Sequence, residues 1–123
     1  MRRRHLPLLA ASAALPWGTI ARAQELPTRP IRMVVTFPPG GSSDIVGRVL
    51  AEALGARLPA RPIIDNRPGA GGTLGAGHVA TQAPDGSVLL MSNTAPIVTS
   101  PPLYPNITYN PVTGLTHIGR MFR

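Results

Sequence analysis

A short segment rich in glycine and serine contains the residues best suited to holding a small ligand. It reads Pro38-Pro39-Gly40-Gly41-Ser42-Ser43-Asp44 and separates a β-rich run, which ends at Phe37, from an apolar helical pattern. Glycine lets a backbone approach a ligand closely, and the start of a helix offers unpaired N–H groups and a partial positive charge. These features, with two serine hydroxyls, suit a carboxylate or a phosphate. They fit equally a plain strand-to-helix turn in which Ser42 or Ser43 caps the helix.

Two further polar segments have a similar position after a β-rich run. Asn66-Arg67-Pro68-Gly69-Ala70-Gly71-Gly72 lacks the terminal Gly-Lys-Ser or Gly-Lys-Thr of a phosphate-binding P-loop, and the chain contains no lysine. Its glycine spacing is not the full dinucleotide fingerprint either, so nucleotide binding is not supported. The third segment is Ser92-Asn93-Thr94.

Catalytic and metal chemistry find little support in the residues. Asp44 and Asp65 are the only acids near these segments, and an aspartate in the first turn of a helix favours a stabilising role over acid–base work. No Gly-x-Ser-x-Gly elbow is present. His78 and His117 are far apart and have no acid at metal-ligand spacing. We therefore expect no catalytic residue, metal or cofactor, and a small anion-binding enzyme remains only as an alternative.

Alternating apolar segments predict the elements that position these loops. Strands are expected at 31–37, 62–65 and 87–91, and helices at 42–58 and 73–82. Residues 95–115 are expected to form a long loop with at most a short helix, and residues 116–122 to begin a fourth strand. The apolar face of the first helix is predicted to consist of Ile45, Val46, Val49, Leu50, Ala53 and Leu54.

Strands that alternate with helices indicate an α/β fold with a mainly parallel sheet flanked by helices. Ligands of such sheets bind at the carboxyl ends of the strands. Because each of the three polar segments follows a predicted strand, we expect them to gather at one edge of the sheet.

Length, charge and cysteine content narrow the class further. The chain has 123 residues and no cysteine, which suits one domain at most and excludes a disulfide framework. Its formal net charge is +7, but four of the twelve basic residues lie within the first 23 positions. The other arginines are scattered among the acids and form no patch interleaved with aromatic side chains, so no nucleic-acid partner is expected.

Residues 1–23 have the pattern of a secretory signal peptide. A basic start, Arg2-Arg3-Arg4-His5, precedes an apolar stretch, and Ala21-Arg22-Ala23 is a small-x-small site that predicts cleavage after Ala23. The apolar stretch is well short of the ~20 residues that a membrane-spanning helix needs. The sequence thus predicts export to the periplasm, by either the general or the twin-arginine route.

Four motifs in order resemble the Bug-type solute receptors of tripartite tricarboxylate transporters. They are the run from Arg29 to Asp44, the run Asp65-Asn66-Arg67-Pro68-Gly69-Ala70-Gly71-Gly72, then Ala83-Pro84-Asp85-Gly86, and Leu103-Tyr104-Pro105. The resemblance implies a two-lobed periplasmic binding fold that captures a small carboxylate, passes it to membrane transporter subunits and performs no chemistry. It implies as ligand-binding positions Phe37, Pro39, Gly40, Gly41, Ser42, Ser43, Asp44, Asn66, Gly71, Gly72, Ser92, Asn93 and Thr94.

The resemblance also sets an expectation for domain organisation. A two-lobed receptor needs two domains of ordinary size, so residues 24–123 are expected to form part of the first lobe, with the second lobe missing. A truncated gene product without function is the alternative that this expectation leaves open.

Overall fold

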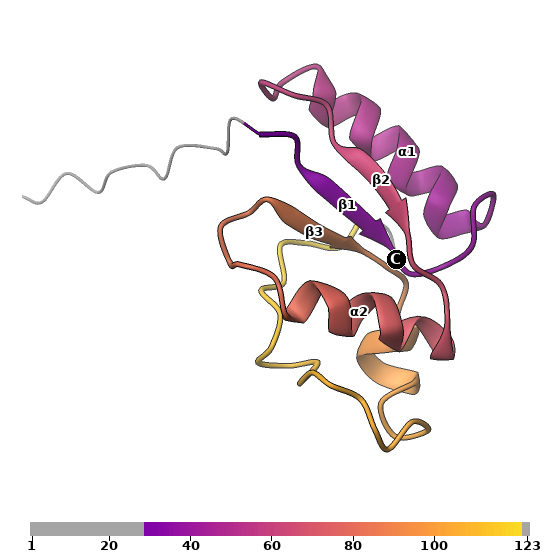
Figure 1. Cartoon of the computed structure of the whole chain (residues 1–123). Coiled ribbons are helices and arrows are strands. Elements are labelled where there is room, and N and C mark those ends of the chain that lie inside the picture. Colours follow the sequence, from indigo (N-terminus) through magenta and orange to yellow (C-terminus); the bar gives the residue numbers. More distant parts are fainter. Residues whose placement is uncertain (1–28, 122–123) are drawn as a thin grey trace, which may run out of the picture.

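A three-stranded parallel sheet is the centre of the computed structural model, which describes residues 29–121. Its strands are β1 (Arg32–Val35), β2 (Ile63–Asn66) and β3 (Val88–Met91), in the order β2-β1-β3 (Figure 1). Met33 lies beside Ile64 on one side and Leu89 on the other, and both pairings are parallel. The predicted parallel sheet is confirmed. The predicted signal peptide and its cleavage site lie outside the described residues.

Two helices cover the sheet, α1 (Ser42–Gly55) against β1 and β2 and α2 (Thr73–Ala80) against β1 and β3. Figure 1 shows them on either side of the sheet, as is required when one right-handed crossover runs from β1 to β2 and the next runs in the opposite direction from β2 to β3. The central strand β1 is therefore buried on both faces: Met33, Val34, Val35 and the following Thr36 are at most 1% exposed. A strand that is buried on both faces consists of consecutive apolar residues, which explains the β-rich pattern in the sequence.

The predicted apolar face of α1 is wrong in part: Val46, Leu50 and Leu54 are half-buried, whereas Ile45, Val49 and Ala53 are exposed. Ile45 and Val49 are 56% and 66% exposed, and the residues that the helix buries are Ser43, Asp44, Gly47 and Ala51. The reason is close packing: a Cβ on Gly47 would lie 3.3 Å from Val35 Cγ2. The small residues bring the helix axis near the sheet, and Ile45 and Val49 point away from it.

The expected serine cap is also wrong. Gly41 is the N-cap of α1 and no side chain caps it, so that Ser42 is already the first helical residue. Gly41 is extended (φ −72°, ψ 165°), the conformation that a residue before a helix usually has.

The segments that follow the strands include two short helical turns. A 3₁₀ turn, η1 (Ala70–Gly72), leads into α2, and a π-helical turn, η2 (Ala95–Thr99), follows β3. The expected fourth strand is wrong for its described part, because residues 116–121 pair with no other strand. Residue 122 lies outside the described residues.

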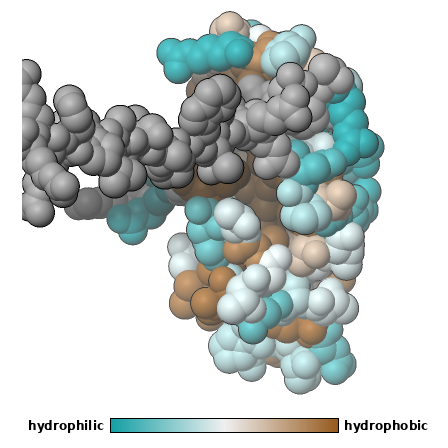
Figure 2. All heavy atoms as spheres, turned by 90° about the vertical axis from the view of Figure 1, so that its left-hand side faces the viewer, coloured by the Kyte–Doolittle hydropathy of each residue, from teal (hydrophilic) through white to brown (hydrophobic). Residues whose placement is uncertain are grey.

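The described surface mixes apolar and polar side chains. Figure 2 shows brown apolar areas between hydrophilic ones on one face. Val112 and Ile118, in the C-terminal part of the chain, are 76% and 82% exposed. Within residues 29–121, none of the helices has the length and apolar character that crossing a bilayer requires.

Candidate functional site

The three polar segments gather at one edge of the sheet, as expected, because all three strands are parallel and each segment follows a strand end. Side-chain hydrogen bonds join them in pairs. The Asn66 amide donates to the Phe37 carbonyl at 3.1 Å, and the hydroxyls of Thr36 and Ser92 lie 2.7 Å apart. The carboxyl end of central β1 is thereby tied to the ends of both neighbouring strands.

The loop between β1 and α1 turns sharply over a few residues. The Gly41 N–H donates to the Pro38 carbonyl at 3.2 Å, and Gly40 has φ +83° with open space where a Cβ would be. Pro39 and Gly40 are exposed and Phe37 is half-buried. Position 40 thus favours glycine, because its positive φ is a backbone conformation that other residues rarely adopt.

The start of α1 carries unpaired donors. The N–H groups of Asp44 and Ile45 both donate to the Gly41 carbonyl at 3.0 Å. Among the described residues, neither the backbone N–H nor the hydroxyl of Ser42 or Ser43 has a hydrogen-bond partner. An anion placed at this helix start would find up to two N–H donors and two hydroxyls.

Asp44 lies beneath the loop, only 2% exposed. Its Oδ2 accepts the Gly40 N–H and the Arg48 Nε–H, each at 2.9 Å, and its Oδ1 accepts the Asn66 amide at 2.9 Å. The hydrogen bond from Arg48 above all, with those from Gly40 and Asn66, holds the pKa of the Asp44 carboxyl well below its usual range. The carboxylate is therefore ionised at neutral pH and its acceptor sites face protein donors.

The glycine-rich loop after β2 uses its glycines for close packing. Gly71 and Gly72 have φ +62° and +89°. A Cβ on Gly72 would lie 3.2 Å from Thr36 Oγ1, and one on Gly71 would lie 2.4 Å from the hydroxyl of Ser100, which donates to the Gly71 carbonyl at 3.0 Å. These two positions bring the loop against the end of β1 and against the segment after η2.

In the loop after β3, one residue is hydrogen-bonded to the end of β1 and two lie at the start of η2. Ser92 is half-buried against Thr36, while Asn93 and Thr94 are exposed. The Asn93 side-chain oxygen accepts the Ala95 N–H at 2.9 Å, and the Thr94 carbonyl accepts the N–H groups of Ile97 and Val98. The third loop is thus ordered by local hydrogen bonds.

Sequence reasoning missed three residues that shape this edge. Thr36 and Ser100 are buried and hydrogen-bonded to the loops, and Gly47 lets α1 pack closely on the sheet. Thr36 carried a signal, since it is a polar residue near the end of a mostly apolar run. Ser100 carried none, because its partner Gly71 is distant in the sequence.

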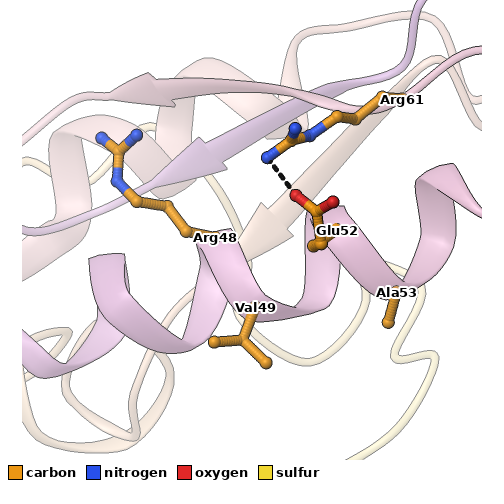
Figure 3. A pocket seen from close by; sticks show the side chains of 5 residues that line it. All are labelled: Arg48, Val49, Glu52, Ala53 and Arg61. Carbon is orange, nitrogen blue, oxygen red and sulfur yellow. Dashed lines mark ion pairs between the residues drawn. The ribbon is translucent and has the colours of Figure 1, made fainter.

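A shallow hollow of about 530 Å³ lies elsewhere, along the outer side of α1 (Figure 3). Its lining comes from α1 and from Arg61, which forms an ion pair with Glu52 at 2.6 Å. Arg48 at its rim is paired with Asp44. Because the hollow lies along the helix and not at the strand ends, we do not assign the ligand to it. Within residues 29–121 no three His, Cys, Asp or Glu residues are grouped as metal ligands.

Known proteins resemble the chain in both sequence and structure. Residues 46–123 match the family described as tripartite tricarboxylate transporter family receptor. The chain is 42% identical to the protein BugT of Bordetella pertussis over 97 residues, which are 78% of this chain and 30% of that protein. The curated relatives it matches are about three times as long, since it spans 27–38% of each.

Two solved structures are similar to this chain in fold. MatC from Rhodopseudomonas palustris with bound malate is 36% identical, with a TM-score of 0.64 over 69% of this chain and 29% of that one. The periplasmic binding protein BugD is 39% identical, with a TM-score of 0.60 over 72% of this chain and 29% of that one.

Proposed function

Since this chain belongs to the tripartite tricarboxylate transporter receptor family, we propose that it binds a small carboxylate in the periplasm for delivery to transporter subunits in the membrane. Members of the family are solute-binding proteins and not enzymes. The parallel sheet with its flanking helices is part of a periplasmic binding fold. Residues 1–23 would act as the exported and cleaved leader, and residues 24–123 would form part of the first lobe.

The observation that carries this proposal concerns the first two N–H groups of the 14-residue helix α1, those of Ser42 and Ser43, which have no hydrogen-bond partner among residues 29–121. Such a helix end attracts negative charge, and a carboxylate can accept both hydrogen bonds with its two oxygens. The loop from Phe37 to Asp44 would therefore be the main carboxylate-binding element. Asn66, Gly71 and Gly72, and the loop Ser92, Asn93 and Thr94, would border it.

Neutral donors at this edge favour a carboxylate over a phosphate. The two arginines near the loops are engaged, Arg48 with Asp44 and Arg67 with Asp65, each at 2.9 Å. A phosphate dianion would concentrate about two charges at the helix start, where the described residues offer no uncommitted cation, whereas each carboxylate group of a ligand brings only one. The malate bound to the relative MatC supports the same ligand class.

Isothermal calorimetry on the purified chain tests the proposal. The panel contains malate, succinate, citrate, benzoate and inorganic phosphate, with MatC and malate measured in parallel. We expect saturable binding of at least one carboxylate, no chemical change of that ligand, and no binding of phosphate. A chain that melts cooperatively yet binds none of the carboxylates would contradict the proposed function.

A further inference from the structure

We propose that Asp44, Asn66 and Arg48 form a positioning network that fixes the β1–α1 loop and neutralises a negative charge beneath it, without touching the ligand themselves. This inference rests on the proposed function, because it assigns the network to the carboxylate site at the same loop. The three side chains come from two elements, α1 and the end of β2, and converge below Gly40 and Phe37.

Asp44 determines where the loop lies relative to the helix start. By accepting the Gly40 N–H, its carboxylate holds the residue with φ +83° directly before the N-cap Gly41. The Gly40 N–H is thereby committed to Asp44 and is not available to an anion. The N–H groups of Ser42 and Ser43 remain unpaired, so the network separates structural donors from donors left for a ligand.

Asn66 fixes the same loop from the neighbouring strand. A single side-chain nitrogen, Nδ2, donates to both the Phe37 carbonyl at 3.1 Å and Asp44 Oδ1 at 2.9 Å. An amide NH₂ has two hydrogens, and the two acceptors use both. Aspartate or leucine, which are similar in size, cannot replace this function because neither provides the two donors.

Arg48 compensates the charge that this arrangement buries. A carboxylate that is 2% exposed below an anion site would repel the anion over several ångströms. Arg48 donates to it from one helical turn along α1, at 2.9 Å, while its own side chain is 54% exposed. The ion pair between Arg48 and Asp44 therefore allows a carboxylate to lie beneath a site for negatively charged ligands.

The experiment compares three variants with two matched controls. Asp44→Asn, Asn66→Ala and Arg48→Met alter the network, while Asp85→Asn and Arg61→Met make the same kinds of change in ion pairs away from the loops. Malate affinity is measured by calorimetry, folding by circular dichroism, and the loop by the ¹H–¹⁵N resonances of Gly40, Ser42 and Ser43.

We expect Asp44→Asn and Asn66→Ala to bind malate at least tenfold more weakly and to shift the Gly40 resonance, with the controls within twofold of the unaltered chain. Arg48→Met should lose more affinity for malate than for the monoanion lactate, and this difference should shrink as salt is raised. A purely structural role for Arg48 would weaken both ligands equally and independently of salt, and that result would overturn its assigned part.

The outcomes separate the network from the proposed function. If Asp44→Asn fails to fold, Asn66→Ala and Arg48→Met decide the matter. If the unaltered chain binds no carboxylate, the proposed function fails, and the network is judged by the resonances alone. Shifts of Gly40, Ser42 and Ser43 in the network variants but not in Asp85→Asn would then support loop positioning, and unchanged resonances would overturn it.

Discussion

The Ser42→Pro chain is expected to bind its carboxylate roughly ten- to a hundredfold more weakly than the Ser42→Ala chain, with no loss of thermal stability. Proline is tolerated at the first helical position, and the preceding Gly41 is extended, as a residue before proline must be. The substitution therefore removes the Ser42 N–H and leaves α1 in place. A hydrogen bond to a charged group contributes about 1.5–3 kcal/mol, which sets the expected loss.

The alanine variant is the control, because it removes the Ser42 hydroxyl and keeps the backbone donor. Calorimetry gives the two dissociation constants, and a melting curve of each variant verifies that the helix is intact. Equal affinities of the two variants, both folded, would show that the Ser42 N–H does not contact the ligand.

The second large effect concerns stability. Gly75→Ala should lower the free energy of unfolding by about 2 kcal/mol, the cost typical of overpacking a close contact. A Cβ there would lie 2.8 Å from the Arg67 carbonyl and 3.0 Å from Thr36 Cγ2. The Arg67 oxygen is a backbone atom and cannot rotate away as a side chain can. The alanine therefore forces α2 to move away from the sheet. This cost exceeds the gain of up to ~1 kcal/mol that alanine brings to a helix interior.

Gly77→Ala, on the same helix, is the matched comparison. A Cβ there meets Thr108 Oγ1 at 2.6 Å, but Thr108 is exposed and its side chain is free to rotate. We expect this variant to be as stable as the unaltered chain or slightly more so. Chemical denaturation of both variants is the measurement, and a Gly75→Ala chain at least as stable as the Gly77→Ala chain would contradict the close packing described for α2.

The order of elements and the gathering of the loops could be predicted from the sequence because they depend on local patterns. Short apolar runs, each followed by a polar or glycine-rich segment, indicated three strands, and alternation with helices indicated that the strands are parallel. From that alone the segments after Phe37, Asp65 and Met91 were expected to share an edge, and they do. The strand ends differed by at most two residues, since pairing stops where a neighbour stops.

The helix orientation and the network could not be predicted because both depend on tertiary contacts. Counting apolar residues placed Ile45 and Val49 toward the sheet, whereas the close approach permitted by Gly47 and Ala51 decides the buried face. Likewise, Asp44 could be recognised as a stabilising residue of the helix start. That Asn66, 22 residues further along the chain, shares its carboxylate follows only from the packing of β2 beside β1.

The central claim is that the helix start after β1 holds the carboxylate, and the ¹H–¹⁵N spectrum of the unaltered chain during a malate titration tests it most directly. The account predicts the largest shifts at the amides of Ser42 and Ser43, with smaller ones at Asn66 and Ser92. Largest shifts at Ala53 and Arg61, in the hollow along α1, with unchanged amides at Ser42 and Ser43, would contradict it.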